Sequence, residues 1–219
     1  MLYLIFALQL VGSTPAAAVP VEDEPLHRVV HASKELRVFD IVIPPHASTL
    51  YHVHVHDLVG VTITPGPSRD EKAGASVVDD PPDKPGEVWL AAHPQRDVHR
   101  VTNLGESQIH MVAVELLSPG SATNTPVPRG TAAGAVQLDN SEARVVRYSL
   151  EPGQTSKSHS HGSYVLVPLG PGRIGNVCGG SEPRLVPEAG FLCVGTERQH
   201  EISNVGDTPI ELLEFEIAP

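Results

Sequence analysis

Aromatic residues are scarce in this sequence, and several motifs that would assign a function are missing. Phenylalanine, tryptophan and tyrosine make up 4% of the 219 residues, so a large flat aromatic ligand would find few stacking partners. The sequence has no P-loop, no glycine-rich dinucleotide loop and no GxSxG element, which argues against the protein classes that depend on them. No long stretch has the periodicity of an amphipathic helix, so helix should be nearly absent.

Positive charge is also in short supply. The chain has 15 Lys and Arg residues against 26 Asp and Glu residues, which gives a formal net charge of -11 at pH 7. Nucleic acids and anionic membrane surfaces bind basic patches, so neither is expected as a partner. A small-molecule ligand or substrate is expected instead, and a homo-oligomer is left open.

Cysteine occurs only twice, as Cys178 and Cys193. Neither belongs to a CxxC element, so thiol redox chemistry and zinc-thiolate binding are not expected. In an oxidising compartment the pair could form a disulfide. Two buried thiols on neighbouring strands are the other interpretation, because strand geometry decides whether the sulfurs can meet.

The first 18 residues carry no charged side chain, contain the apolar run LYLIFALQLVG and end in three alanines. Such an ending is typical of signal-peptidase sites, and the run is too short for a comfortable membrane span. We therefore expect residues 1–18 to be a signal peptide. The mature protein should be secreted or periplasmic, without membrane attachment after cleavage. The missing positive n-region leaves two alternatives: a truncated start, or a segment retained as a lipid-facing N-terminus.

The remaining sequence consists largely of short apolar runs separated by glycine and proline, a pattern typical of an all-β barrel or sandwich. The expected strands are LRVFDIVI, LVGVTI, EVWLAA and HMVAVELL in the first half, and RVVRYSL, YVLVPL, GFLCVG and IELLEFEI in the second.

Histidine, in contrast, is abundant and patterned. Twelve histidines occur, and one arrangement appears twice: an HxH pair, then a third histidine and an asparagine further along. Two residues separated by one position on a strand point to the same face, so both imidazoles of a pair can converge on one metal ion. The two sets are His52, His54 and His99 with Asn103, and His159, His161 and His200 with Asn204.

The two sets can be superimposed along the chain. A shift of 107 positions lays the first HxH pair on the second, and a shift of 101 positions lays His99 on His200. The difference predicts an insertion between the motifs, and residues 64–86 have the Pro, Gly and Asp content of such a loop. The chain is therefore expected to contain two copies of one domain, which can bury two cores or share one interface.

The segments around these histidines resemble the cupin superfamily. HASTLYHVH and GQTSKSHSH look like the first cupin motif, and PQRDVHRVTN and GTERQHEISN look like the second. The resemblance implies an all-β bicupin: two tandem cupin-type jelly-roll β-barrels, each with an internal metal site. The implied division is an N-terminal extension at 19–35, barrels at 36–117 and 143–219, and a linker at 118–142.

One cupin feature is absent from both halves. Cupin metal sites commonly add a glutamate three or four residues after HxH, but those positions hold Leu58 and Val59, then Val165 and Leu166. Two neutral three-histidine sets remain, each leaving a divalent ion with open positions. Iron is expected first, with zinc, copper, manganese or nickel as alternatives. The expected ligands are His52, His54, His99, His159, His161 and His200.

His56 adds an alternative in the first half. His54 and His56 could form the metal-binding pair, but only His52 and His54 align with histidines of the second half, where Ser163 occupies the position of His56. His56 is therefore expected in the pocket, as a spare ligand or a proton carrier. Asp57 is expected at the surface or as a hydrogen-bond partner behind the ligands.

The other singled-out residues have structural interpretations. Asn103 and Asn204 are expected to shape the turns after the second motif. The histidines that stand alone are expected to be packed or solvated side chains. They are His27, His31, His93 and His110.

Three classes of function agree with these features. The first is an exported metal-dependent oxidoreductase, such as a non-haem-iron dioxygenase acting on a small organic substrate, with His56, Tyr164 and Glu197 as candidate acids or bases. The second is a non-catalytic extracytoplasmic module that binds a metal or small ligand. The third is a storage bicupin with idle sites.

Overall fold

The structure, a computed structural model, describes residues 17–93, 95–118, 134–160, 162–196 and 199–217. Helix within these ranges is limited to one 3-10 turn, η1 (Val21–Asp23). The predicted all-β fold is confirmed, and each of the eight expected strands is present at least in part. None of the helical structure described is long and apolar enough to cross a membrane.

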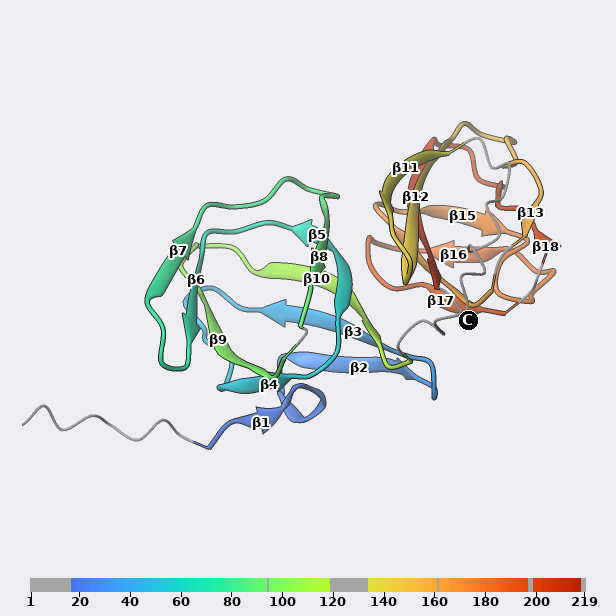
Figure 1. The fold of residues 1–219 in the computed structure, drawn as a ribbon. Coiled ribbons are helices and arrows are strands. Elements are labelled where there is room, and N and C mark those ends of the chain that lie inside the picture. Colours follow the sequence, from blue (N-terminus) through green and yellow to red (C-terminus); the bar gives the residue numbers. More distant parts are fainter. Residues whose placement is uncertain (1–16, 94, 119–133, 161, 197–198, 218–219) are drawn as a thin grey trace, which may run out of the picture.

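Residues 19–116 form two five-stranded sheets, coloured blue to green in Figure 1. The first sheet has the order β1 (Val19–Pro20), β4 (His52–His54), β9 (Asp97–Asn103), β6 (Ser68–Lys72) and β7 (Val77–Asp80). The second has the order β2 (His27–Ala32), β3 (Leu36–Ile43), β10 (Ile109–Leu116), β5 (Leu58–Thr64) and β8 (Val88–Ala91).

Two expectations about this half need correction. Residues 64–86, expected to be a loop, contain the hairpin of β6 and β7, and β6 pairs with β9. Residues 19–35, expected to be an extension, contribute β1 and β2 to the sheets by pairing with β4 and β3. This pairing satisfies backbone N–H and C=O groups along the edges of β3 and β4. The first barrel therefore begins before residue 36.

Residues 135–217 form the second set of sheets, coloured yellow to red in Figure 1. The largest has the order β11 (Ala135–Asp139), β12 (Ala143–Leu150), β20 (Ile210–Ile217), β14 (Tyr164–Pro168) and β17 (Cys193–Gly195). The smaller ones contain β16 (Arg184–Val186), β15 (Gly172–Gly175) and β19 (Ser203–Asn204), and β13 (His159–Ser160) with β18 (Gln199–His200). Strand β11 lies in the expected linker, so the second barrel also begins earlier than predicted.

The register of the strands repeats between the halves. In the first half β4 pairs with β9 so that His52 lies opposite His99. In the second half β13 pairs with β18 so that His159 lies opposite His200. The sheet order β2-β3-β10-β5-β8 likewise corresponds to β11-β12-β20-β14-β17. The internal repeat seen in the sequence is therefore also a repeat of topology.

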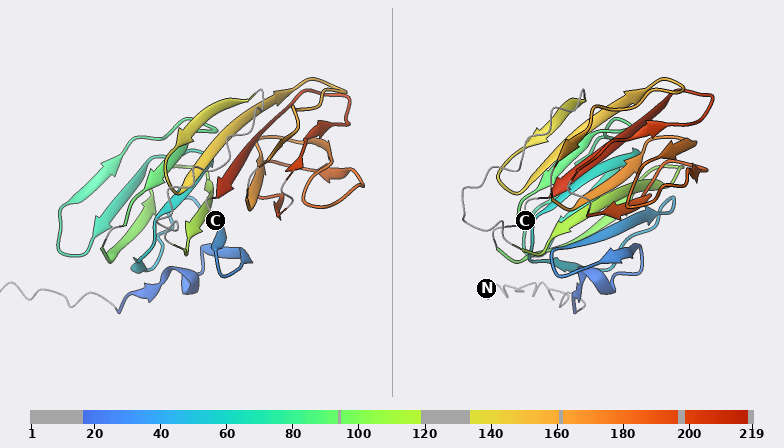
Figure 2. Two further views of the ribbon diagram at one scale, coloured as in Figure 1. Left: turned by 45° about the vertical axis from the view of Figure 1, so that its right-hand side comes forward. Right: turned by 90° about the vertical axis from the view of Figure 1, so that its right-hand side faces the viewer.

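The two halves share a hydrophobic core, which explains why the long strands are apolar on both faces. One face of β3 and β10 turns inward, with Phe39 and Ala113 in the core of the first barrel. The other face presents Val38 and Val114 to a cluster that also contains Phe215 of β20. Figure 2 shows these sheets of the two halves stacked in layers. The halves therefore share one interface in addition to their own cores.

Candidate metal centres

The first histidine set converges inside the first barrel. His52 and His54 lie two positions apart on β4 and therefore point to one face, and His99 faces His52 from β9. His52 is fully buried, and His54 is 4% exposed. Each of the three residues offers one ring nitrogen, and these three nitrogens all lie within 4.8 Å of one another.

Hydrogen bonds behind the rings orient two of these imidazoles. Nδ1 of His52 lies 2.9 Å from the carbonyl oxygen of Leu50, and Nδ1 of His99 lies 2.9 Å from Oδ1 of Asp70. When Nδ1 donates its proton to such an acceptor, the lone pair is on Nε2. Nε2 of both residues is buried and makes no hydrogen bond within the described part of the chain. This arrangement fits a metal ion, which would use these lone pairs.

The environment keeps the imidazoles of His52 and His54 neutral. Burial lowers the pKa of His52 to about 4. Burial, followed by the charges of His99 and His52, lowers the pKa of His54 to about 2. Neutral imidazole is the form that binds metal.

His27 and His93 join this cluster, although the sequence suggested no role for them. The ring of His27 is 4.6 Å from that of His52, and its Nδ1 is 2.7 Å from Oε2 of the buried Glu24. The ring of His93 stacks on that of His54 at 4.8 Å. Both residues lie outside the cupin-like motifs, so only the packing of β2 and of the segment before β9 reveals their position.

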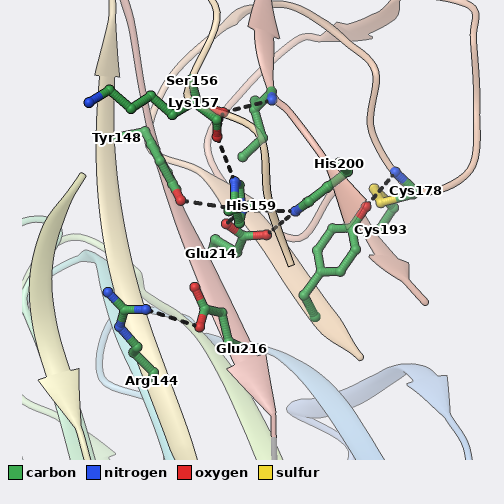
Figure 3. Close-up of polar contacts among 12 residues, drawn as sticks. Arg144, Tyr148, Ser156, Lys157, His159, Cys178, Cys193, His200, Glu214 and Glu216 are labelled. Carbon is green, nitrogen blue, oxygen red and sulfur yellow. Dashed lines mark hydrogen bonds and ion pairs between the residues drawn. A yellow bond between two sulfur atoms is a disulfide. The ribbon is translucent and has the colours of Figure 1, made fainter. Parts of the chain in front are cut away.

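The second cluster differs in composition, because a glutamate enters it. His159 of β13 and His200 of β18 have their Nε2 atoms 3.0 Å apart. Glu214 of β20 places Oε2 at 2.9 Å from Nε2 of His159 and Oε1 at 2.8 Å from Nε2 of His200 (Figure 3). These three residues form the second group able to hold a metal ion. The expectation of a carboxylate-free site is therefore wrong for this barrel.

Glu214 was not expected in the site, because the glutamate of a cupin motif follows the HxH pair closely and Glu214 lies more than 50 residues beyond it. A signal was present, since Glu214 is a charged residue inside the strongly apolar strand IELLEFEI. Its counterpart in the first half, at a shift of 101, is Ala113. Strand β20 pairs with β12 and β14, which brings Glu214 from the end of the chain into the barrel.

Tyrosines line the second cluster. The hydroxyl of Tyr148 lies 3.5 Å from Nε2 of His159 (Figure 3). Burial and the neighbouring carboxylate of Glu214 raise the pKa of Tyr148, so this hydroxyl stays protonated. Tyr164, an expected acid or base, has its ring 4.3 Å from that of His200, and its hydroxyl accepts a hydrogen bond from the backbone N–H of Cys178.

Charge also distinguishes the second cluster from the first. Burial disfavours protonation of His159, but the hydrogen bond and charge of Glu214 outweigh it and raise the pKa of His159. His52 and His54 thus resist protonation, whereas His159 favours it.

The remaining expected site residues fall into two groups. His161 and Glu197 lie outside the described residues, and their roles remain predictions. His56 is in the bend between β4 and β5, outside the group of His52, His54 and His99. Burial raises the pKa of Glu115, and the neighbouring Arg37 and then His56 oppose this rise. Asp57 accepts a hydrogen bond from the backbone N–H of His93, and so supports the residue stacked on His54.

The two asparagines hold the turns that follow β9 and β19. The side-chain nitrogen of Asn103 donates to the carbonyl oxygens of Ile43, Pro44 and Ser107. The side-chain nitrogen of Asn204 donates to the carbonyl oxygens of Leu150 and Thr208. Each side-chain oxygen accepts from the glycine two residues on, which is the turn-shaping role expected from the sequence.

The two cysteines form a disulfide, which decides between the two interpretations left open by the sequence. Cys193 lies on β17 and Cys178 in the turn after β15, close to the hydroxyl of Tyr164. The bridge therefore ties together the wall of the second barrel behind Tyr164 (Figure 3).

Comparison with known proteins identifies the fold. Neither family models nor curated proteins match the sequence. AerE from Microcystis aeruginosa has a similar structure, with a TM-score of 0.58 and 13% identity over 90% of this chain and 99% of that chain. A salicylate 1,2-dioxygenase from Pseudaminobacter salicylatoxidans gives a TM-score of 0.60 and 12% identity over 98% and 88%.

A mutant salicylate 1,2-dioxygenase in complex with gentisate gives a TM-score of 0.60 and 11% identity, over 92% of this chain and 77% of that chain. At such identities the likeness concerns the fold. Together with the repeated sheet order and the paired histidines, it shows that the chain has the two-barrel jelly-roll fold of the cupins.

Proposed function

We propose that this protein is a metal-dependent oxidoreductase of the dioxygenase type, which holds a divalent metal ion in its barrels and acts on a small organic molecule. The observation that carries the proposal is the convergence of His52, His54 and His99 in a buried site. There the Nε2 lone pairs of His52 and His99 have no hydrogen-bond donor among the described residues. Leaving buried nitrogens unsatisfied is costly, and a bound cation removes the cost.

A bound divalent ion would supply Lewis acidity and, if it is iron, the electron-transfer capacity needed to use dioxygen. The chain contributes pre-oriented imidazoles. Leu50 and Asp70 hold the rings of His52 and His99, so little reorganisation is needed on metal binding.

A cavity in the first barrel supports the proposal that the substrate is a small molecule. Its volume is about 300 Å³, near the lower end of the usual range for ligand pockets. Val101 and Met111 provide apolar lining, and Thr62 donates a hydrogen bond to Asp83 at its polar side. Val101 follows His99 by two residues on β9 and lies on the same face of the strand. The cavity therefore begins two residues along β9 from the histidine cluster.

Metal analysis combined with oxygen uptake tests the proposal. The protein is stripped with chelator, reloaded separately with Fe(II), Zn(II) and Cu(II), and assayed for bound metal and for oxygen consumption with small organic acids. Gentisate is the first candidate, because one structural neighbour was solved in complex with it.

Bound iron with substrate-dependent oxygen uptake is expected. Retention of zinc or copper without turnover under any condition would instead favour a non-catalytic binding module. Absence of bound metal would reject both functions.

We also propose that the protein is exported. The Cys178–Cys193 disulfide supports this, since disulfides persist in oxidising compartments. Mass spectrometry of the protein produced with its full N-terminus should find a mature chain beginning near Val19. An uncleaved chain in the cytoplasm would contradict export.

A further inference from the structure

An arginine–glutamate pair occurs once in each half, at corresponding places of the repeat. In the first half Arg37 of β3 lies opposite Glu115 of β10, and in the second Arg144 of β12 lies opposite Glu216 of β20. The two pairs are related by the same shifts of 107 and 101 positions that relate the histidine motifs. Glu115 is 1% exposed and Glu216 has no exposed surface, so both carboxyl groups lie inside the protein.

The first of these arginines holds two carboxylates. Nη1 of Arg37 donates to Oε2 of Glu115 at 2.5 Å, and Nη2 of Arg37 lies 3.3 Å from Oε1 of Glu22. Glu22 belongs to the turn η1, which lies between β1 and β2. A guanidinium has five N–H donors, so it can bind two carboxylates at once. Arg37 finds both of them within the chain.

The second arginine lacks the second carboxylate. Arg144 is 7% exposed, and its Nη1 lies 3.5 Å from Oε2 of Glu216 (Figure 3). Nε and Nη1 of Arg144 are buried and make no hydrogen bond within the described part of the chain. At the shift of 107 the residue that corresponds to Glu22 is Arg129, which lies outside the described residues. The repeat therefore carries a cation at the sequence position where the first half has a carboxylate.

We propose that Arg144 forms an oxyanion-binding site in the second barrel, and that this site takes the carboxylate of a small ligand in the role that Glu22 has beside Arg37. A guanidinium stays charged at any ordinary pH, and burying it with unsatisfied N–H groups is costly. A ligand carboxylate removes this cost through charge-assisted hydrogen bonds. The inference is independent of the proposed metal-dependent function, because Arg144 is in neither group of candidate metal ligands.

The surroundings of Arg144 favour a small monocarboxylate. Its side chain is 9% exposed, so only a small group can reach the guanidinium. The carboxyl group of Glu216 already lies on one side of Arg144, so a doubly charged anion such as phosphate would bring more negative charge into the protein than the arginine can compensate. Acetate, or the carboxylate end of a small organic acid, fits these limits.

Titration of the full chain with sodium acetate tests the inference. The protein is first treated with chelator, so that no metal-bound carboxylate contributes, and sodium chloride keeps the ionic strength constant. NMR signals of arginine Nε labelled with nitrogen-15 report each arginine separately, and carbon-13-labelled acetate reports total binding. Inorganic phosphate is titrated in parallel.

Three variants are compared with the wild type. Arg144→Lys keeps a positive charge beside Glu216 but removes Nε and the planar fork, and Arg37→Lys makes the same change at the corresponding place of the first half. These two variants also assign the Nε signals. Glu22→Ala removes the second carboxylate of Arg37 and should create an acetate site in the first half. If circular dichroism shows that Arg144→Lys does not fold, the wild type and Glu22→Ala still provide the test.

Acetate should shift the Nε signal of Arg144 in the wild type and leave that of Arg37 unchanged. Arg144→Lys should weaken acetate binding at least about tenfold, and Arg37→Lys less than about twofold. In Glu22→Ala the signal of Arg37 should respond as well. An Arg144 signal that does not respond to acetate, or equal weakening by the two lysine variants, would overturn the inference. A response to phosphate but not to acetate would overturn the assignment to a carboxylate.

Discussion

Glu214 and Ala113 occupy the same place in the two halves of the repeat, and Glu214 lies 2.9 Å from Nε2 of His159 and 2.8 Å from Nε2 of His200, whereas Ala113 offers a methyl group. The carboxylate raises the pKa of His159, whereas burial among other imidazoles lowers the pKa of His52 and His54. A single side chain on the last strand thus makes two barrels of the same topology chemically different.

The assignment of the first site can be tested with His52 and His56. His52→Ala should weaken metal binding by the first barrel at least about tenfold, because it removes a buried nitrogen donor that faces His99. His56→Ala should change the affinity less than about twofold, since His56 lies outside the cluster. Competition with a chromogenic chelator measures both, and the opposite order would move the site to His54 and His56.

The metal-free protein should lose stability in mild acid. His52 has its pKa lowered from 6.5 to about 4 in the folded state, so unfolding takes up a proton between these values. The free energy of unfolding therefore falls as the pH drops from 6.5 towards 4, and His52 alone contributes a loss of about 2 kcal/mol by about pH 5. Urea unfolding at about pH 7.5 and about pH 5 measures this.

His52→Gln is the control for the acid effect, because glutamine does not titrate. Its stability should change less with pH than that of the wild type. An equally steep loss in His52→Gln would show that other groups cause the acid sensitivity.

The buried asparagines should contribute strongly to stability. Asn204→Ala removes a side chain that donates to Leu150 and Thr208 and accepts from Gly206, leaving those backbone groups unsatisfied. We expect a loss of about 2–3 kcal/mol, and a similar loss for Asn103→Ala. Chemical denaturation should show a smaller loss for Asn140→Ala, a turn residue closer to the surface. Equal losses at all three positions would contradict a special role for the two turns.

The disulfide should stabilise the second barrel. Replacing Cys178 and Cys193 together by serine opens a loop with a sequence separation of 15 residues. The chain-entropy argument gives a loss of about 3 kcal/mol. Thermal unfolding of the double variant, compared with wild type under oxidising and reducing conditions, measures it. A wild type that is insensitive to reductant and matches the variant would show that the bridge contributes nothing.

Much of the fold could be predicted because it depends on local patterns. The apolar runs of β3 and β20 were predicted residue for residue, since short apolar runs bounded by Gly and Pro are properties of the chain itself. The HxH spacing of His52 and His54 places both rings on one face of any strand. The prediction of a loop at 64–86 was wrong. The polar hairpin of β6 and β7 is stabilised by the pairing of β6 with β9, and no local sequence pattern indicates this pairing.

The sequence by itself determined the repeat, the all-β architecture and the shared face of His52 and His54, because strand periodicity and spacing act over a few residues. Only the tertiary structure decided which distant side chains join them. Glu214, His27 and His93 reach the clusters through strand pairing and packing across the barrel, and the shared core of the halves forms for the same reason. Contacts between segments far apart in the chain depend on the register and packing of whole sheets, which no short window of sequence contains.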